Sequence, residues 1–186
     1  MNRPDKLNLK DGEYFLISTH REENVDDKDS FLKLIDSFNA LAEKYRKPLI
    51  VTTHPRTSNR IKEYGVEVDT LINLHKPFGY FDYVQLQKNA FCVLSDSGTI
   101  QEEASLLGFP AVQIRESSER PEAFDTGNVI LSGLDKGIIL QAVEIATSQF
   151  LGGKRFEVPT DYQSTNVSDK VLRLIVGLTG IIKKNW

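Results

Sequence analysis

The chain has 186 residues, of which 40% are hydrophobic and 26% charged, and its formal net charge at pH 7 is −3. This is the composition of one globular domain with a substantial core. The charges do not have the pattern of a nucleic-acid-binding or membrane-surface protein. No apolar run reaches the ~18 residues that a transmembrane helix needs. Its single cysteine, Cys92, and a polar N-terminal segment that lacks the apolar stretch of a secretion signal predict a cytoplasmic protein.

Short runs of β-branched and aromatic residues alternate with longer segments of helical spacing along the chain. These runs are apolar on both faces, as in a parallel sheet that is covered by helices on both sides. The alternation predicts a single α/β domain over residues 1–186, a Rossmann-like doubly wound parallel sheet of about six strands. The expected strands are 14–19, 48–53, 70–75, 91–96, 111–115 and 128–133.

The segments between the expected strands have the spacing of amphipathic helices. The first helix is expected to be capped by Ser30 or Asp29, and two later helices are expected to end at Gly65 and Gly108. Residues 151–166 are expected to form a loop, and 167–180 a terminal helix that packs on another domain. The expected internal helices are 30–45, 57–65, 80–89, 99–108 and 136–150.

The most unusual polar residues follow four expected strands. In open parallel sheets, ligands bind outside the carboxyl ends of the strands, so we expect these segments to line one polar crevice. The segments are THREEN (19–24), THPR (53–56), SDSGT (95–99) and RESSERPE (115–122).

The SDSGT segment lies where a strand is followed by a helix. Backbone amides and hydroxyls of Ser97, Gly98 and Thr99 at a helix start favour a phosphate, and glycine permits close approach. Glu102 and Glu103 point about 100° apart, so one is expected to face the crevice and accept ribose hydroxyls, since a carboxylate beside phosphate would repel it. The alternative is a turn and helix cap, with the glutamates as a capping device.

Histidine and arginine residues supply further candidates at the same strand ends. His20, beside Arg21, could contact a ligand or act as an acid or base, and His54 is a weaker candidate of the same kind. Arg115 and Arg120 are the type of residue that binds a diphosphate in bidentate fashion. The alternatives are an ordinary surface histidine and a solvated salt-bridge loop.

Aromatic residues at the start of the helix 80–89 could stack on a base, although Tyr80, Phe81 and Tyr83 have a spacing that is more often part of a core. The histidines lack metal-ligand spacing, so no metal site is expected. No glycine-rich turn follows the first strand, which disfavours a nicotinamide-dependent oxidoreductase, and no cofactor is expected.

Taken together, THREEN, THPR, SDSGTIQEE and ERPE resemble the C-terminal half of the non-hydrolysing UDP-N-acetylglucosamine 2-epimerases, from about Tyr14 to the terminal helix. Those enzymes resemble two-domain GT-B glycosyltransferases. The resemblance implies a UDP-sugar held between two domains and inversion at C2 by anti elimination of UDP and its re-addition. It also implies a homodimeric full-length enzyme, and an N-terminal domain, lacking in this chain, that supplies the carboxylates for proton abstraction at C2.

The resemblance also assigns roles to individual residues. It implies that His20 is catalytically important near the diphosphate, with Arg21 beside it. It further implies that Ser97 and Gly98 hold phosphate and that Glu103 accepts the ribose hydroxyls.

Other positions follow the family less closely. The resemblance implies that Tyr83 covers uracil, that Arg115 and Arg120 belong to a diphosphate-binding loop, and that His54 matches a histidine that helps some members bind an allosteric UDP-N-acetylglucosamine. Thr99 replaces the usual second glycine, and HREENVD replaces the commoner HRREN form. Both features are similar to relatives that invert C2 of a 6-deoxy UDP-amino-sugar on the way to UDP-N-acetylfucosamine.

The sequence therefore predicts the UDP-binding part of a 2-epimerase for bacterial capsule or other surface polysaccharide synthesis, inactive as this chain alone. Three alternatives stay open: a 2-epimerase of a 6-deoxy UDP-amino-sugar, a GT-B glycosyltransferase domain, and a nucleotide-sugar sensor without chemistry.

Overall fold

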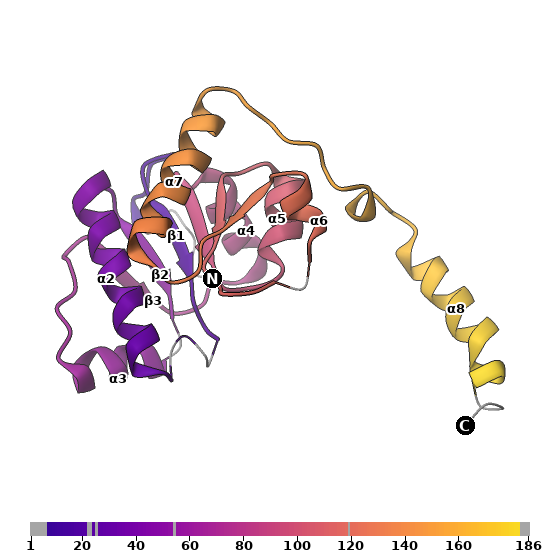
Figure 1. Ribbon diagram of the computed structural model, residues 1–186, viewed down its shortest axis with the longest axis horizontal. Coiled ribbons are helices and arrows are strands. Elements are labelled where there is room, and N and C mark those ends of the chain that lie inside the picture. Colours follow the sequence, from indigo (N-terminus) through magenta and orange to yellow (C-terminus); the bar gives the residue numbers. More distant parts are fainter. Residues whose placement is uncertain (1–6, 22–23, 25, 54, 119, 183–186) are drawn as a thin grey trace.

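The computed structural model describes residues 7–21, 24, 26–53, 55–118 and 120–182. Its described strands form one parallel six-stranded sheet in the order β3-β2-β1-β4-β5-β6 (Figure 1). This confirms the predicted Rossmann-like α/β fold, and each strand lies within the range expected for it. The strands are β1 (Phe15–Ser18), β2 (Leu49–Thr52), β3 (Ile72–His75), β4 (Cys92–Ser95), β5 (Ala111–Gln113) and β6 (Val129–Leu131).

The strand order reverses between β1 and β4, at the centre of the sheet. These two strands pair in parallel, with Phe15 opposite Cys92 and Ser18 opposite Ser95. The chain crosses from β1 towards β2 and β3 on one side, and from β4 towards β5 and β6 on the other. The loops after β1 and β4 therefore diverge at the point where doubly wound sheets form a ligand-binding crevice.

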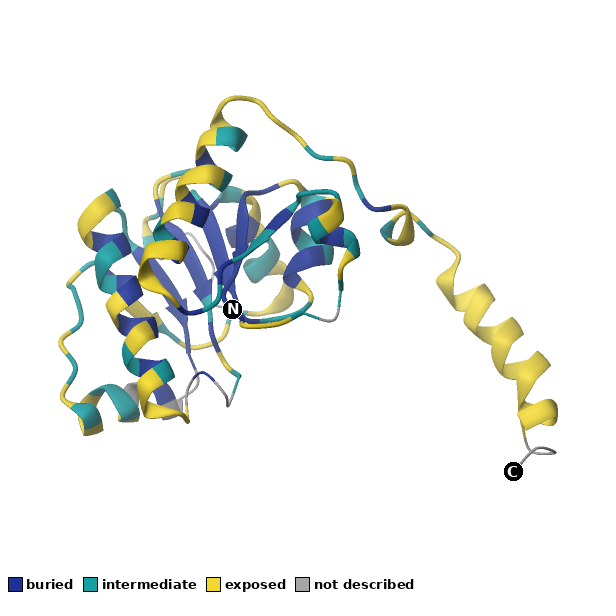
Figure 2. Ribbon diagram, in the orientation of Figure 1, coloured by how far each residue is buried: buried dark blue, intermediate teal, exposed yellow. Residues whose placement is uncertain are grey.

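Helices cover both faces of the sheet. Successive strand residues point to opposite sides, and the side chains on both sides are apolar, so each face needs a layer of helices to bury it. Phe15 and Ile17 belong to the core shared with α2 and α7, while Tyr14 and Leu16 belong to the core shared with α4 and α5. Figure 2 shows the buried strands between these layers. The helices are α2 (Lys28–Tyr45), α3 (Pro55–Tyr64), α4 (Tyr80–Asn89), α5 (Ile100–Leu107), α6 (Glu122–Asp125), α7 (Lys136–Leu151) and α8 (Val167–Ile182), with a 3-10 turn η2 (Thr160–Tyr162).

Helix ends differ from the sequence prediction at α2. Its cap is Asp27, whose carboxylate accepts a hydrogen bond of 2.8 Å from the backbone amide of Ser30. The expectation of Ser30 or Asp29 was wrong because the helix begins two residues earlier than expected. Gly108 ends α5 with φ +70°, as predicted from its tolerance of the left-handed region.

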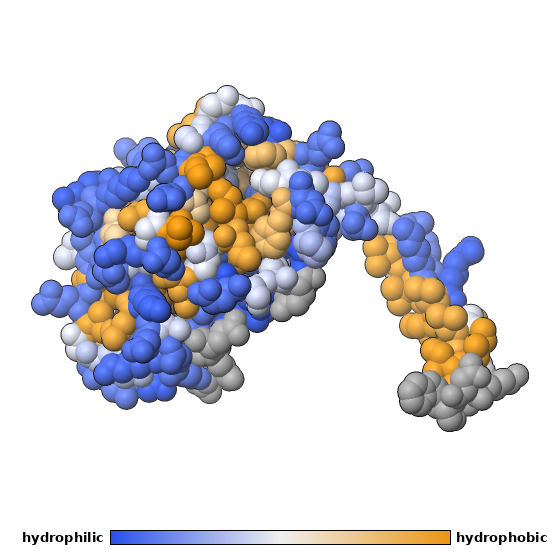
Figure 3. All heavy atoms as spheres, in the orientation of Figure 1, coloured by the Kyte–Doolittle hydropathy of each residue, from blue (hydrophilic) through white to orange (hydrophobic). Residues whose placement is uncertain are grey.

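Helix α8 extends away from the rest of the chain (Figure 1), and none of its residues is buried. One side of it is apolar in the space-filling view (Figure 3). Leu172 and Val176 are 61% and 73% exposed, although a monomeric domain normally buries such a surface. Among the residues that the structure describes, no helix has both the length and the apolar character needed to cross a bilayer.

Candidate functional site

The loop that follows β1 is fixed to the end of β4 by a buried carboxylate. Asp96 has no exposed surface, and its Oδ2 accepts hydrogen bonds from the backbone amides of His20 and Arg21, each at 3.0 Å. The Asn24 side-chain amide donates a third bond to the same oxygen at 3.2 Å. Asp96 therefore holds the two basic residues of THREEN beside the SDSGT loop.

The ring of His20 lies at the rim of this region. Its Nδ1 is 3.3 Å from Asp96 Oδ1, and the side chain is 58% exposed. One edge of the imidazole thus faces the buried carboxylate while much of the ring remains open to solvent. This geometry suits a residue that contacts a ligand.

The SDSGT loop makes its own contacts. The Ser97 amide donates to Ser95 Oγ at 3.1 Å, and the Thr99 amide donates to Ser97 Oγ at 3.3 Å. The expectation that all three amides of Ser97–Thr99 are open is therefore wrong for two of them, because neighbouring serine hydroxyls accept their protons. The side-chain Nε2 of Gln113 donates to the Ser97 carbonyl at 3.2 Å and so anchors the loop to β5.

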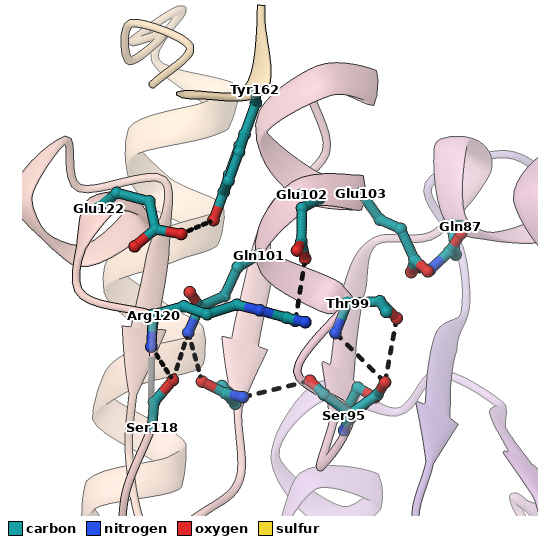
Figure 4. A network of polar contacts seen from close by, with 12 residues as sticks. Gln87, Ser95, Thr99, Gln101, Glu102, Glu103, Ser118, Arg120, Glu122 and Tyr162 are labelled. Atoms are coloured by element: carbon teal, nitrogen blue, oxygen red, sulfur yellow. Dashed lines mark hydrogen bonds and ion pairs between the residues drawn. The ribbon is translucent and has the colours of Figure 1, made fainter. Parts of the chain in front are cut away.

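Gly98 provides space for the guanidinium of Arg120. A Cβ added at Gly98 would lie 2.6 Å from Arg120 Nη1, closer than real Cβ contacts allow. The same nitrogen donates to Glu102 Oε2 at 3.2 Å, so the arginine extends from the loop before α6 across the start of α5 (Figure 4). The segment RESSERPE therefore supplies a cation to the same loop, as the sequence predicted.

The two glutamates of α5 point towards different partners. While Glu102 pairs with Arg120, Glu103 accepts a hydrogen bond of 2.5 Å from the side-chain amide of buried Gln87 on α4. The side chain of Thr99, the residue before α5, makes no capping hydrogen bond, although the hydroxyl of Ser97 accepts from the Thr99 amide. The two glutamates are thus engaged with Arg120 and Gln87 and do not cap the helix by the pattern that the alternative supposed.

Tyr83 lies on α4 near Ser18 and Glu103. Burial raises the pKa of its phenol to about 12; a hydrogen bond with the Ser18 side chain opposes this rise, and the charges of Glu103 and Asp96 add to it. The ring is therefore close to the carboxyl ends of β1 and β4. Tyr80 and Phe81, by contrast, are 75% and 83% exposed and belong to neither core cluster.

The remaining predicted residues are placed differently. Arg115 is only 4% exposed, so its side chain lies beneath the surface of the site and its role towards a diphosphate stays a prediction. His54 lies outside the described residues. Within the described ranges, no group of three or more His, Cys, Asp or Glu side chains has the arrangement of a metal site.

The sequence alone assigned no role to Asp96 or to the side-chain amides of Gln101 and Gln113, which support the SDSGT loop. Gln101 Nε2 donates to Gln113 Oε1 at 2.9 Å and to Ser118 Oγ at 2.7 Å, which joins α5, β5 and the following loop. Tyr162 of η2 donates to Glu122 Oε1 at 2.9 Å and so connects the long C-terminal segment to α6 (Figure 4). A carboxylate directly after an apolar strand was the available signal for Asp96, since such a position is buried.

Comparison with known proteins identifies the family. The family model for UDP-N-acetylglucosamine 2-epimerase matches residues 2–176. The chain belongs to this family. The resemblance carried by THREEN, THPR, SDSGTIQEE and ERPE is thereby confirmed at the level of the family.

Individual relatives show how much of the epimerase this chain represents. The UDP-N-acetylglucosamine 2-epimerase of Methanococcus maripaludis is 42% identical over 139 residues, which are 73% of this chain and 38% of that protein. The solved epimerase from Rickettsia bellii is 39% identical with a TM-score of 0.83, covering 99% of this chain and 49% of that one. The epimerase of Methanocaldococcus jannaschii, solved in complex with UDP-GlcNAc and UDP, is 32% identical with a TM-score of 0.78, covering 91% and 46%. The chain thus spans less than half the length of these epimerases.

Proposed function

We propose that this chain is the UDP-binding domain of a UDP-N-acetylglucosamine 2-epimerase, with the nucleotide at the carboxyl ends of β1 and β4. The observation that carries the proposal is the junction made by Asp96, which holds His20 and Arg21 beside the Ser97–Thr99 loop. Support comes from the M. jannaschii epimerase of the same fold, which was solved with UDP-GlcNAc and UDP.

The diphosphate would lie at the start of α5. There it would meet the hydroxyls of Ser97 and Thr99, the cation of Arg120 and the open side of His20. Arg120 is now paired with Glu102 at 3.2 Å, so a phosphate would compete with or share that contact. The helix dipole and the guanidinium charge of Arg120 both favour a phosphate at this position.

The nucleoside would extend from the diphosphate towards α4. In this arrangement Glu103 accepts the ribose hydroxyls and Tyr83 covers uracil, because both lie between α5 and α4 beside the end of β1. Arg115 would act from beneath the diphosphate, and His54 is proposed to contribute to a second, allosteric UDP-N-acetylglucosamine site.

Catalysis would require the part of the epimerase that this chain does not span. In the elimination a base removes the C2 proton while the C1–O bond to UDP breaks. In the re-addition UDP bonds to C1 again and a proton is delivered to the opposite face of C2, which returns the sugar with C2 inverted. We propose that an N-terminal domain supplies this base, that the apolar side of α8 packs on that domain, and that the complete enzyme is a cytoplasmic homodimer in surface polysaccharide synthesis. The exposure of α8 supports the packing proposal.

A 6-deoxy UDP-amino-sugar is the alternative substrate. The observation that favours it is Thr99, which carries a side chain where the family usually has glycine and whose Oγ1 lies 3.0 Å from Ser97 Oγ. A competition experiment between UDP-N-acetylglucosamine and its 6-deoxy analogue on the complete enzyme distinguishes the two substrates.

Calorimetric titration of the purified chain with UDP, UMP and uridine tests the proposal. We expect affinity to fall with each phosphate removed, and Arg120→Ala to weaken UDP but not uridine. Arg60→Ala is the matched control, since Arg60 also forms an ion pair, with Glu63 at 3.0 Å, but lies on α3. Equal affinity for UDP and uridine would contradict the proposed diphosphate site, and C2 inversion by the chain alone would contradict the need for a second domain.

A further inference from the structure

Asp96 has two oxygen atoms with different surroundings, although both are buried. Its Oδ2 accepts three hydrogen bonds from the loop after β1. Its Oδ1 makes no hydrogen bond of acceptable geometry within the described part of the chain, while His20 Nδ1 lies 3.3 Å away. A buried carboxylate oxygen without a hydrogen-bond donor is energetically costly. A small rotation of the exposed His20 ring would bring its Nδ1–H into line with Asp96 Oδ1.

The direction of that contact is fixed by chemistry. An ionised carboxylate only accepts hydrogen bonds, so the nitrogen that faces Oδ1 must carry a proton. In a neutral imidazole the other nitrogen, Nε2, then has the lone pair. Because the His20 side chain is 58% exposed, Nε2 can face solvent or a ligand rather than the core.

We propose that Asp96 is a positioning residue for His20, fixing the proton on Nδ1 and leaving Nε2 as the atom that meets the ligand. In the neutral ring Nε2 accepts a proton, and in the imidazolium it donates a hydrogen bond to an anionic oxygen. The part of this inference that concerns the ligand rests on the proposed function, since the diphosphate is the anion placed there. The part that concerns the ring is a property of the chain itself.

The substitution Asp96→Asn separates the two tasks of the carboxylate. The asparagine oxygen can still accept from the amides of His20 and Arg21, which keeps the loop in place. Its NH₂ group would then face His20 Nδ1 and require a lone pair there, so the proton moves to Nε2. A purely structural role for Asp96 predicts no such change.

Nitrogen-15 NMR of the labelled chain without ligand, recorded at an alkaline pH so that the imidazole rings are neutral, reports which nitrogen carries the proton. We expect a protonated Nδ1 at His20 in the wild type and a protonated Nε2 in D96N. His75 is the internal control: its Nδ1 lies 2.6 Å from the Lys76 carbonyl, another pure acceptor, and its signals should be the same in both proteins.

Titration with UDP and uridine completes the experiment. We expect D96N to bind UDP up to about tenfold more weakly, because without the carboxylate the ring donates to the diphosphate through a neutral Nε2–H and not through the charge-assisted bond of an imidazolium, and to bind uridine as well as the wild type does. A wild-type His20 that carries its proton only on Nε2, or the same tautomer in both proteins, overturns the inference. If D96N does not fold, the wild-type tautomer alone decides. A tautomer switch in a chain that does not bind UDP would support the positioning role and contradict the proposed function instead.

Discussion

Replacing Gly98 with alanine tests the proposed anion site at its most crowded point. The added Cβ would lie 2.6 Å from Arg120 Nη1 and 3.3 Å from its Cζ, so the guanidinium must move. Gly98 does not have a positive φ, so the alanine backbone itself is unstrained. The substitution therefore acts on Arg120, a long side chain whose end can move at little cost to the fold.

The expected effects on stability and on binding differ in size. Moving Arg120 breaks its ion pair with Glu102. The side chains of Arg120 and Glu102 are 37% and 32% exposed, and ion pairs with this much exposure to solvent contribute about 0–1 kcal/mol to the free energy of folding. A hydrogen bond from a charged group to a ligand contributes about 1.5–3 kcal/mol, so UDP affinity should fall about 10- to 150-fold. Binding is thus far more sensitive than stability.

A double-mutant cycle isolates the cause. Calorimetry with UDP on the wild type, G98A, R120A and the double variant measures whether the two substitutions act through the same contact. If G98A weakens binding by displacing Arg120, it should have almost no further effect once Arg120 is alanine. Thermal unfolding of the same four proteins measures the small expected loss of stability.

Gly79→Ala is the matched control, because its Cβ would lie 3.9 Å from Asp82 Oδ2, an ordinary contact, and its φ of −66° suits alanine. We expect G79A to bind UDP as the wild type does. Full UDP affinity in G98A would refute the reasoning, as would an equally large loss when G98A is introduced into R120A.

Further substitutions test the neighbouring assignments. Glu103→Ala should reduce the preference for UDP over 2′-deoxy-UDP from about tenfold to none, as measured by calorimetry, because the carboxylate then no longer accepts from the ribose. Tyr83→Phe should remove one phenol group whose ionisation is seen in the ultraviolet absorbance near pH 12. Folding raises the pKa of this phenol from about 10 to about 12, so its contribution to the free energy of unfolding is fully present below about pH 10 and is lost as the pH rises through 12. Val176→Lys on α8 should change the unfolding free energy of this chain by less than about 0.5 kcal/mol because the side chain is 73% exposed, whereas Ile139→Ala, at a fully buried position, should cost about 2–5 kcal/mol in denaturant unfolding. A large loss of stability in Val176→Lys would mean that α8 packs on this domain.

The convergence of the strand ends could be predicted from the sequence because it follows from parallel topology. Once THREEN and SDSGT each follow a buried strand, both must lie at the same edge of the sheet, and the structure joins them through Asp96. The direction of Arg120 could not be predicted, since a side chain in an irregular loop is placed by contacts with Gly98 and Glu102. Arg115 illustrates the same limit: it was expected at the rim and is buried.

The sequence by itself determined the strands, the helices that cover them and the edge of the sheet where polar residues collect, because periodicity and chain connectivity are local properties. Only the tertiary structure decided which oxygen of Asp96 holds the loop, which glutamate faces Arg120, and which amides of the SDSGT loop already have partners. The contacts of Asp96 and Glu102 join residues that are far apart in the chain, and those within the SDSGT loop depend on its exact backbone path, so all of them rest on ångström-scale distances that no residue pattern encodes.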